Sequence, residues 1–156
     1  LVQIISNDDV IRAYKPLRRH SELFDDGSNG WQQWVYPELH KALQDYRLSQ
    51  NETFLRHLLR EEVAGVFSFE LFTETFCKMF LDELDGYYAS GLPIVRPNSM
   101  NNYGIIVNEI GMRGAITSLQ KEILHPLSEI LYPVQAAGGF TSHHSFMVQY
   151  KANEDL

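Results

Sequence analysis

The segment GVFSFELFTETFCKMFLDELD (residues 65–85) decides the fold class, because the spacing of its apolar residues changes in the middle. From residue 66 to residue 71 the side chains alternate between apolar and mixed faces, which predicts a short strand. After Thr73, a predicted helix N-cap, apolar residues recur at helical spacing and predict an amphipathic helix. Its predicted apolar stripe consists of Phe76, Cys77, Phe80, Leu81 and Leu84. The chain is therefore expected to combine strands with helices.

The same change of spacing recurs on both sides of this segment. Strands are predicted at 104–107 and 145–150, and a long helix between them is expected to bend at Pro126 and to end at Tyr132-Pro133. Glycines at 86 and 91 are expected to end the helix that follows Thr73. Before residue 62 the pattern is helical, with capping residues at 6–9 and Pro16 shortening the first helix.

Composition limits the classes of function. The chain has 156 residues and a net charge of −7, from 13 basic and 20 acidic residues, with no basic run. A sequence-independent grip on nucleic acid is therefore not expected. No apolar run approaches the ~20 residues of a membrane helix. The single cysteine, Cys77, excludes an intramolecular disulfide framework and favours a reducing compartment such as the cytoplasm or nucleus.

The spacing of chemically active residues reveals no complete catalytic or metal site. His143 and His144 would point to opposite faces of a strand, which makes a shared metal ion unfavourable. Glu122 and His125 have the spacing of a di-iron helix motif, but the motif has no second copy. His57 and Glu61 are interpreted as a solvated pair on a helix, and Cys77 as a small core residue. We therefore predict no catalytic residue and no metal ligand within this chain.

Three further stretches carry a family resemblance: RPNSMNNYGIIVNEIG (96–111), HPLSEILYP (125–133) and SHHSFMVQYKANEDL (142–156). Together with 65–85, they resemble the Fe(II)- and 2-oxoglutarate-dependent oxygenases of the prolyl/lysyl hydroxylase type. Within that family the resemblance points to the group named 2-oxoglutarate and iron-dependent oxygenase domain-containing protein 2 and its plant relatives. It covers the N-terminal part of those proteins.

The resemblance implies a fold and a domain order. An α+β chain is expected, with N-terminal helices followed by the leading strands and supporting helices of a double-stranded β-helix, or jelly roll, that is incomplete here. A helical region would occupy residues 1–62, and the first part of the oxygenase domain residues 63–156. The face of Phe146, Val148 and Tyr150 would point into the barrel.

The resemblance also implies an activity that needs more chain than is present. The full protein would hydroxylate a protein or peptide side chain, prolyl or lysyl by analogy, with Fe(II) and 2-oxoglutarate as cofactors and ascorbate as a candidate third. The iron ligands, a His-x-Asp pair and a distant histidine, would lie beyond Leu156. This chain alone is expected to be inactive and to bind neither cofactor tightly.

A few site residues transfer from the resemblance. Tyr150 matches a tyrosine that in related hydroxylases reaches the co-substrate or the metal's water, although it could instead fill the barrel core. The residues expected on the substrate side are Arg96, Asn101, Asn102, Tyr103 and His144. The amides of this loop could equally serve its own backbone through Asx turns.

Two other readings remain open. The chain could be a non-catalytic helical and β scaffold, or a protein-interaction module. An all-helical interaction protein is disfavoured by the strand-like spacing at 66–71 and 145–150. The expected partner is a protein or peptide substrate, with no nucleic acid and no membrane, and the sequence does not predict an oligomeric state.

Overall fold

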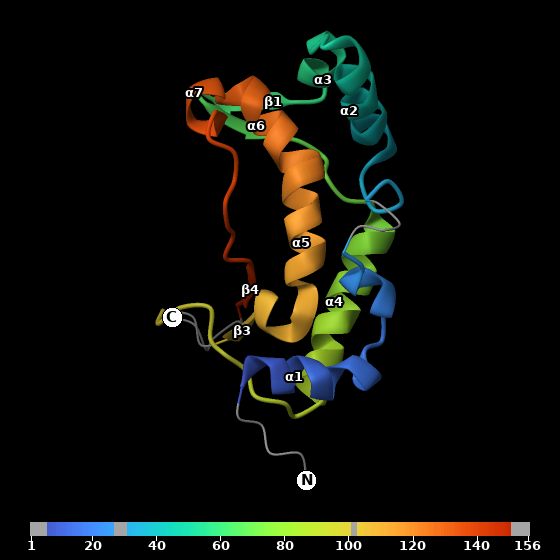
Figure 1. The fold of residues 1–156 in the computed structure, drawn as a ribbon, viewed down its shortest axis with the longest axis vertical. Coiled ribbons are helices and arrows are strands. Elements are labelled where there is room, and N and C mark those ends of the chain that lie inside the picture. Colours follow the sequence, from blue (N-terminus) through green and yellow to red (C-terminus); the bar gives the residue numbers. More distant parts are fainter. Residues whose placement is uncertain (1–5, 27–30, 101–102, 151–156) are drawn as a thin grey trace. The chain divides into compact units, whose positions relative to one another are not determined.

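A computed structural model describes residues 6–26, 31–100 and 103–150 of the chain. The fold is α+β, with helices and, within those residues, two separate two-stranded antiparallel sheets (Figure 1). Two compact units are assembled from interleaved segments. The first combines Leu1–Asp26, Lys78–Thr117 and Ser142–Leu156, and the second combines Gly27–Cys77 and Ser118–Thr141. The expected boundary between residues 62 and 63 stays a prediction, and it falls inside a strand.

The first unit contains two strands and a set of helices that lie far apart in the sequence. Its elements are α1 (Asn7–Tyr14), η1 (Lys15–Leu17), η2 (Ser21–Phe24), most of α4 (Glu74–Ala89), β3 (Tyr103–Ile106), η3 (Asn108–Met112), the start of α5 (Arg113–Leu119) and β4 (Phe146–Gln149).

Helix α1 begins and ends where the sequence predicts. The hydroxyl of Ser6 accepts a hydrogen bond from the backbone N–H of Asp9, and the Asp9 carboxylate accepts one from the N–H of Ser6. This reciprocal capping box provides hydrogen-bond acceptors for two backbone N–H groups that have no partner within the helix. Pro16 follows in a short 3₁₀ turn, because proline has no N–H to continue the helix.

Helix α4 departs from its predicted apolar stripe. Phe76 and Leu84 are buried as expected, but Cys77 is exposed and Leu81 is 58% exposed, so the core role of Cys77 is wrong. The buried face instead runs on through Glu83 and Tyr87. Since Cys77 and Leu81 lie on the edge of the stripe next to Phe76 and Phe80, the apolar pattern alone could not centre it.

The end of α4 is also partly corrected. The helix continues through Gly86 to Ala89, so Gly86 does not end it, whereas the Ser90-Gly91 pair does. A Cβ at position 86 would lie 2.9 Å from Nε of Arg19, so a larger residue there would require the flexible Arg19 side chain to shift. Gly91 has a φ of 69°, in the left-handed region that favours glycine after a helix.

Strands β3 and β4 confirm two of the predicted strands and pair antiparallel. Tyr103 lies opposite Gln149, and Ile106 lies opposite Phe146. Gly104 has a φ of 151°, and a Cβ there would lie 2.4 Å from the carbonyl oxygen of Met147. Only glycine therefore allows the two strands to approach in this register.

The second unit carries the other helices and a hairpin. Its elements are α2 (Pro37–Ser49), α3 (Thr53–His57), β1 (Arg60–Val63), β2 (Val66–Ser68), η4 (Gln120–Leu124), α6 (His125–Leu131) and α7 (Pro133–Ala136). The strand predicted to reach Leu71 ends at Ser68, and Phe72 instead forms an isolated bridge with Val35. Glu61 lies in β1, not on the helix of His57, so their predicted helical pairing is wrong.

The long helix predicted before Tyr132 is a succession of α5, a wide π-helical turn at η4, and α6. Pro126 lies in the first turn of α6 and cannot donate to the carbonyl of Glu122 four residues earlier. Arg47 of α2 donates to that carbonyl instead, through Nη2 at 2.5 Å. The helix changes geometry where the proline was expected to bend it, and Tyr132 ends it as predicted.

Four aromatic side chains pack together in the second unit. Phe72 and Phe76 stack with their ring centroids 4.3 Å apart, and both contact the ring of Trp31. Trp34 lies against Phe76 at 6.0 Å. This cluster joins the loop before α2 to the start of α4, and aromatic pairs of this kind stabilise a core beyond their buried area.

No helix in the described residues is long and apolar enough to span a bilayer.

Candidate functional site

The predicted site residues gather in part at one end of the β3–β4 sheet. Because Tyr103 pairs with Gln149, Tyr150 follows β4 at the end of the sheet where β3 begins. Tyr103 is partly buried, whereas Tyr150 is 74% exposed. Asn101 and Asn102, predicted beside them, lie outside the described residues. The register therefore brings Tyr103 and Tyr150 to the same end of the sheet.

The pairing of β3 with β4 does not place His144 or Arg96 at that end of the sheet. His144 was expected to share the face of Tyr150 if the strand reached back to it, but β4 begins at Phe146. The exposed imidazole of His144 lies against the ring of Phe146, with centroids 5.2 Å apart, at the opposite end of the sheet. Arg96 is exposed in the loop before β3.

The face expected to point into a barrel is open in the described part of the chain. Phe146 is 44% exposed and Tyr150 is 74% exposed, whereas Val148 between them is partly buried. Among the described residues β4 pairs with β3 alone. The physical reason is that one two-stranded sheet has no opposite sheet to cover it. A closed jelly roll is therefore not formed by residues 6–26, 31–100 and 103–150.

A polar cluster holds the entry to β4. The buried amide of Asn108 accepts the backbone N–H of Ser145 at 2.9 Å, and its Nδ2 lies 3.3 Å from Nδ1 of His143. Thr117 donates its hydroxyl proton to the carbonyl of Arg113, so its oxygen accepts from Nε2 of His143 at 3.0 Å. These contacts assign the proton to Nε2 and leave Nδ1 as an acceptor. His143 is thus a positioning residue for β4.

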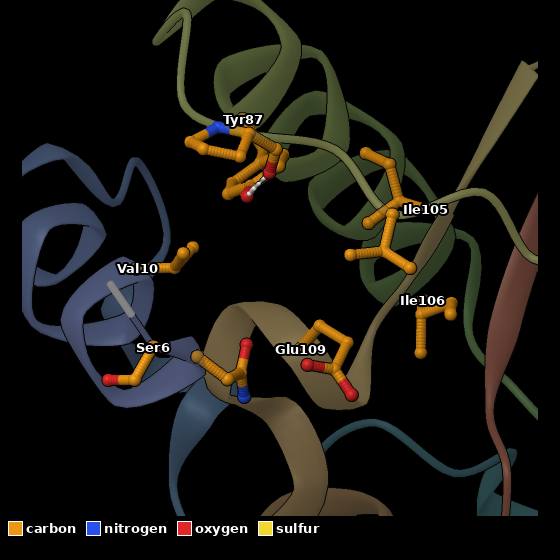
Figure 2. Close-up of a pocket in the computed structure, with 9 residues that line it drawn as sticks. Ser6, Val10, Tyr87, Ile105, Ile106 and Glu109 are labelled. Carbon is orange, nitrogen blue, oxygen red and sulfur yellow. Dashed lines mark hydrogen bonds between the residues drawn. The ribbon is translucent and has the colours of Figure 1, made fainter. Parts of the chain in front are cut away.

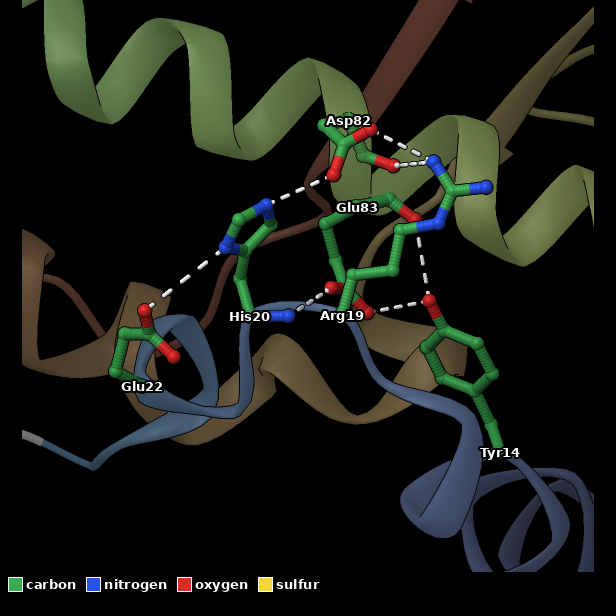
Figure 3. A network of polar contacts seen from close by, with 6 residues as sticks. All are labelled: Tyr14, Arg19, His20, Glu22, Asp82 and Glu83. Atoms are coloured by element: carbon green, nitrogen blue, oxygen red, sulfur yellow. Dashed lines mark hydrogen bonds and ion pairs between the residues drawn. The ribbon is translucent and has the colours of Figure 1, made fainter.

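A second polar network joins the N-terminal segment to α4 (Figure 3). The carboxylate of Glu83, fully buried, accepts hydrogen bonds from the hydroxyl of Tyr14 and from the backbone N–H of His20 at 2.6 Å. Asp82 accepts from Nη1 of Arg19 at 2.7 Å and lies 2.9 Å from Nε2 of His20. Both carboxylates of α4 are therefore engaged by one short stretch of chain.

The network shifts the acidity of two of its members. Burial, and then the hydrogen bond to Glu83, raise the pKa of Tyr14 well above its usual range. Hydrogen bonds from His20 and Arg19 lower the pKa of the exposed Asp82 carboxyl. Because each carboxylate oxygen faces a donor, the network anchors the N-terminal segment to α4.

A pocket of about 320 Å³ opens between α1, the end of α4 and β3 (Figure 2). Figure 2 shows Tyr87 and Glu109 on opposite sides of the opening, with Val10 on a third side and Ile105 and Ile106 on the fourth. Its volume lies at the lower end of the ~300–1,000 Å³ range of small-molecule pockets. A second, almost entirely apolar groove in the other unit is lined by residues of η4, α6 and α7 together with Phe69, Tyr132 and Phe140.

The described residues do not fit an iron site. Among residues 6–26, 31–100 and 103–150, no three His, Cys, Asp or Glu side chains gather closely enough to hold a metal ion. A non-haem Fe(II) centre of the oxygenase type needs two histidines and a carboxylate converging on one point. Iron is therefore not assigned to any described side chain.

Sequence reasoning missed Glu83 and Glu109 as features of the fold. Glu83 lies next to Leu84 on the predicted apolar side of α4, and a carboxylate there indicates a buried polar partner elsewhere in the chain. That signal was available from the helical spacing, but the partner, Tyr14, is 69 residues away. Glu109 carried no signal, because a glutamate near the start of a helix is ordinarily solvated.

Comparison with known proteins identifies related sequences. The family model described as the OGFOD2-like domain matches residues 10–138. A zebrafish (Danio rerio) protein named 2-oxoglutarate and iron-dependent oxygenase domain-containing protein 2 is 37% identical over 146 residues, covering 92% of this chain and 41% of its own length. The human protein of the same name is 33% identical, covering 77% of this chain and 39% of its own.

A plant protein extends this set. The Arabidopsis thaliana protein named 2-oxoglutarate and iron-dependent oxygenase domain-containing protein ICU11 is 31% identical over 69% of this chain and 28% of its own length. The chain thus spans between 28% and 41% of these relatives. No solved structure matches the chain.

Proposed function

Because the chain belongs to the OGFOD2-like domain family, we propose that it is the N-terminal part of an Fe(II)- and 2-oxoglutarate-dependent oxygenase that hydroxylates a protein or peptide side chain. The observation that carries this proposal is the family match over residues 10–138. The names of the relatives give iron and 2-oxoglutarate as the requirements of the family. Prolyl or lysyl side chains are the proposed targets.

The proposal assigns the iron ligands to polypeptide beyond Leu156. It is supported by the share of the zebrafish, human and Arabidopsis relatives that the chain spans, which is at most 41%. Further strands of the longer protein would then pair with β4 and cover the exposed face of Phe146. The double-stranded β-helix is proposed to close in this way.

Within that protein, the chain's own residues would position one wall of the site. Asn108, His143 and Thr117 hold the start of β4 against η3 and α5, and the pairing of Gln149 with Tyr103 holds its end. Tyr150, one residue beyond the strand, is proposed to reach the 2-oxoglutarate. Asn101, Asn102 and Tyr103 would lie on the substrate side at the same end of the sheet. Arg96, in the loop before β3, and His144, just before β4, are also proposed for the substrate side, although the strand pairing does not bring them to that end.

The full-length protein tests the proposal directly. Supplied with Fe(II), 2-oxoglutarate and peptides that contain proline or lysine, it should form succinate and add one oxygen atom to one peptide class. Succinate and intact peptide mass are the two readouts. The chain ending at Leu156 should form no succinate under the same conditions. A full-length protein that binds no Fe(II), or that binds it without consuming 2-oxoglutarate, would favour the binding-module reading.

A substitution separates Tyr150 from a packing role. Tyr150→Phe in the full-length protein should raise the KM for 2-oxoglutarate by about tenfold, the loss expected for one hydrogen bond to a charged group, with an unchanged unfolding midpoint. Tyr46→Phe, on α2 of the other unit, is the matched control and should leave the KM unchanged. An unchanged KM in Tyr150→Phe, or an equal loss of stability and activity, would remove Tyr150 from the site.

A further inference from the structure

The pocket of Figure 2 has a chemical character that the oxygenase assignment does not use. It is lined by residues from α1, the end of α4, the loop before β3, β3 itself and η3. The lining residues are Ser6, Asn7, Val10, Tyr87, Pro93, Val95, Ile105, Ile106 and Glu109. All lie in the first compact unit, so one folded body forms the whole pocket.

The walls of the pocket are apolar. Val10, Ile105 and Ile106 are buried side chains that present methyl groups, and Val95, at the rim, is 55% exposed. The hydroxyl of Tyr87 is already engaged, because it donates to the carbonyl of Pro93 at 2.5 Å. Tyr87 therefore offers its ring and not a free polar group. An aliphatic chain is the ligand part that such walls favour.

Glu109 is the single charged residue in the lining. It is half-buried, and it makes no hydrogen bond or ion pair with the side chains that the structure describes, unlike the capping carboxylate of Asp9 nearby. Burial, and then the negative charge of Glu109, raise the pKa of Tyr87, which places that charge within electrostatic reach of the opposite wall. A half-buried carboxylate without a cation favours a positively charged ligand.

We propose that this pocket binds a lysine side chain of a partner polypeptide, with the aliphatic stem between Val10, Ile105 and Ile106 and the ammonium group on the Glu109 carboxylate. Lysine joins a flexible four-carbon stem to a compact charge, which matches apolar walls with one carboxylate. The guanidinium of arginine carries five N–H donors, of which the Glu109 carboxylate can accept two, and the lining supplies no second carboxylate for the others. The net charge of −7 adds a field that attracts cations.

The binding test uses the full-length protein without Fe(II) or 2-oxoglutarate, so its result does not depend on oxygenase activity. The probes are Nα-acetyl-lysine methylamide, the norleucine analogue that keeps the stem and lacks the charge, and the arginine analogue. Saturation-transfer NMR titration gives the Kd of each. The lysine probe should bind at least about tenfold more tightly than the norleucine probe, the contribution of one charge-assisted hydrogen bond.

Two variants locate the binding to the pocket. Glu109→Gln should weaken lysine binding about tenfold and leave norleucine binding unchanged. Glu38→Gln, the same chemical change at an exposed position on α2, should alter neither Kd. Val95→Lys, at an exposed rim position that tolerates substitution, should place a competing ammonium in the pocket and abolish lysine binding.

Three outcomes would overturn the proposal. Equal binding of the lysine and norleucine probes would show an apolar pocket without charge recognition. Tighter binding of the arginine probe would exclude lysine as the preferred ligand. Unchanged lysine binding in both Glu109→Gln and Val95→Lys, with unfolding midpoints equal to that of the natural protein, would place the bound lysine elsewhere.

Discussion

Glu83 is a buried carboxylate whose hydrogen-bond donors lie far away in the sequence. It is fully buried, and it accepts hydrogen bonds from the phenol of Tyr14 and the backbone of His20. Removing the phenol leaves a buried carboxylate with one donor fewer, which carries a desolvation cost of about 1–3 kcal/mol. Tyr14→Phe should therefore lower the free energy of unfolding by that amount in urea titrations.

The matched control for Tyr14→Phe is Tyr46→Phe on α2 of the other unit. It should change the free energy of unfolding by less than about 0.5 kcal/mol, the range for substitutions outside such networks. A similarly small change in the free energy of unfolding for Tyr14→Phe would show that the hydrogen bond from the His20 backbone is enough to keep Glu83 buried without loss of stability.

Asp82 makes the stability of the first unit depend on acid pH. Its pKa is lowered in the folded state, first by the hydrogen bond from His20 and then by that from Arg19. A depressed pKa contributes stability above the unfolded value of about 3.9, and this contribution is lost as the pH falls through the folded value. Unfolding midpoints in urea should thus fall more steeply below pH 4 in the natural protein than in Asp82→Asn. Parallel pH profiles would contradict this role.

At the scale of single elements, the carbonyl released by Pro126 gives a test of the helix break. Arg47 donates to the Glu122 carbonyl that the proline cannot reach, at 2.5 Å. Arg47→Ala should leave this acceptor to water and lower the free energy of unfolding by about 0.5–1.5 kcal/mol. Lys41→Ala on the same helix, also exposed, is the control, and thermal unfolding followed by circular dichroism measures both. If Arg47→Ala is as stable as this control, the hydrogen bond from Arg47 to the Glu122 carbonyl does not contribute to stability.

Gly104 sets the register of β3 and β4. A methyl group there would meet the Met147 carbonyl oxygen at 2.4 Å and a ring carbon of Pro97 at 2.6 Å, with a φ that disfavours any other residue. Gly104→Ala should cost more than about 2 kcal/mol, since strain and overlap add. Gly138→Ala, with nothing within 4 Å of the added carbon, is the control. Equal urea midpoints for the two variants would show that the strands can separate without loss.

The elements could be predicted from the sequence wherever local spacing decides them. The capping box at Ser6, the strand before Tyr150 and the end of the helix at Tyr132 follow from neighbours within a few residues. What could not be predicted depends on partners far along the chain. The buried face of α4 is centred by contacts with Tyr14 and His20, and the length of β4 is set by its pairing with β3.

The sequence predicted the region of the candidate site, but not which of its residues lie close together. Tyr103 and Tyr150 lie at the same end of the sheet because of the strand register, which spacing does not reveal. His144 was grouped with them on the assumption of a longer strand. Glu109 became visible only when the fold placed β3, α1 and α4 around it. Side chains brought together by non-local pairing are the part of a site that a single sequence leaves open.

For the whole molecule, the exposed strand β4 decides how the chain behaves by itself. Among the described residues it pairs on one side only, and Phe146 and Tyr150 are 44% and 74% exposed. An unpaired edge with apolar side chains favours pairing with a second copy. The chain ending at Leu156 should therefore associate at concentrations where the full-length protein, whose further strands would cover β4, stays monodisperse. Light scattering across a concentration series measures this difference.

A single charge on β4 should distinguish association through the β4 edge from non-specific association of the chain. Phe146→Lys places a cation on the exposed face and should keep the 156-residue chain monomeric at several times the concentration, because charged edge strands resist pairing. Leu48→Lys, at an 88% exposed apolar position on α2, adds the same charge away from the sheet and should leave association unchanged. If both variants suppress association equally, net charge and not the β4 edge controls it, and the case for missing strands at this edge is weakened.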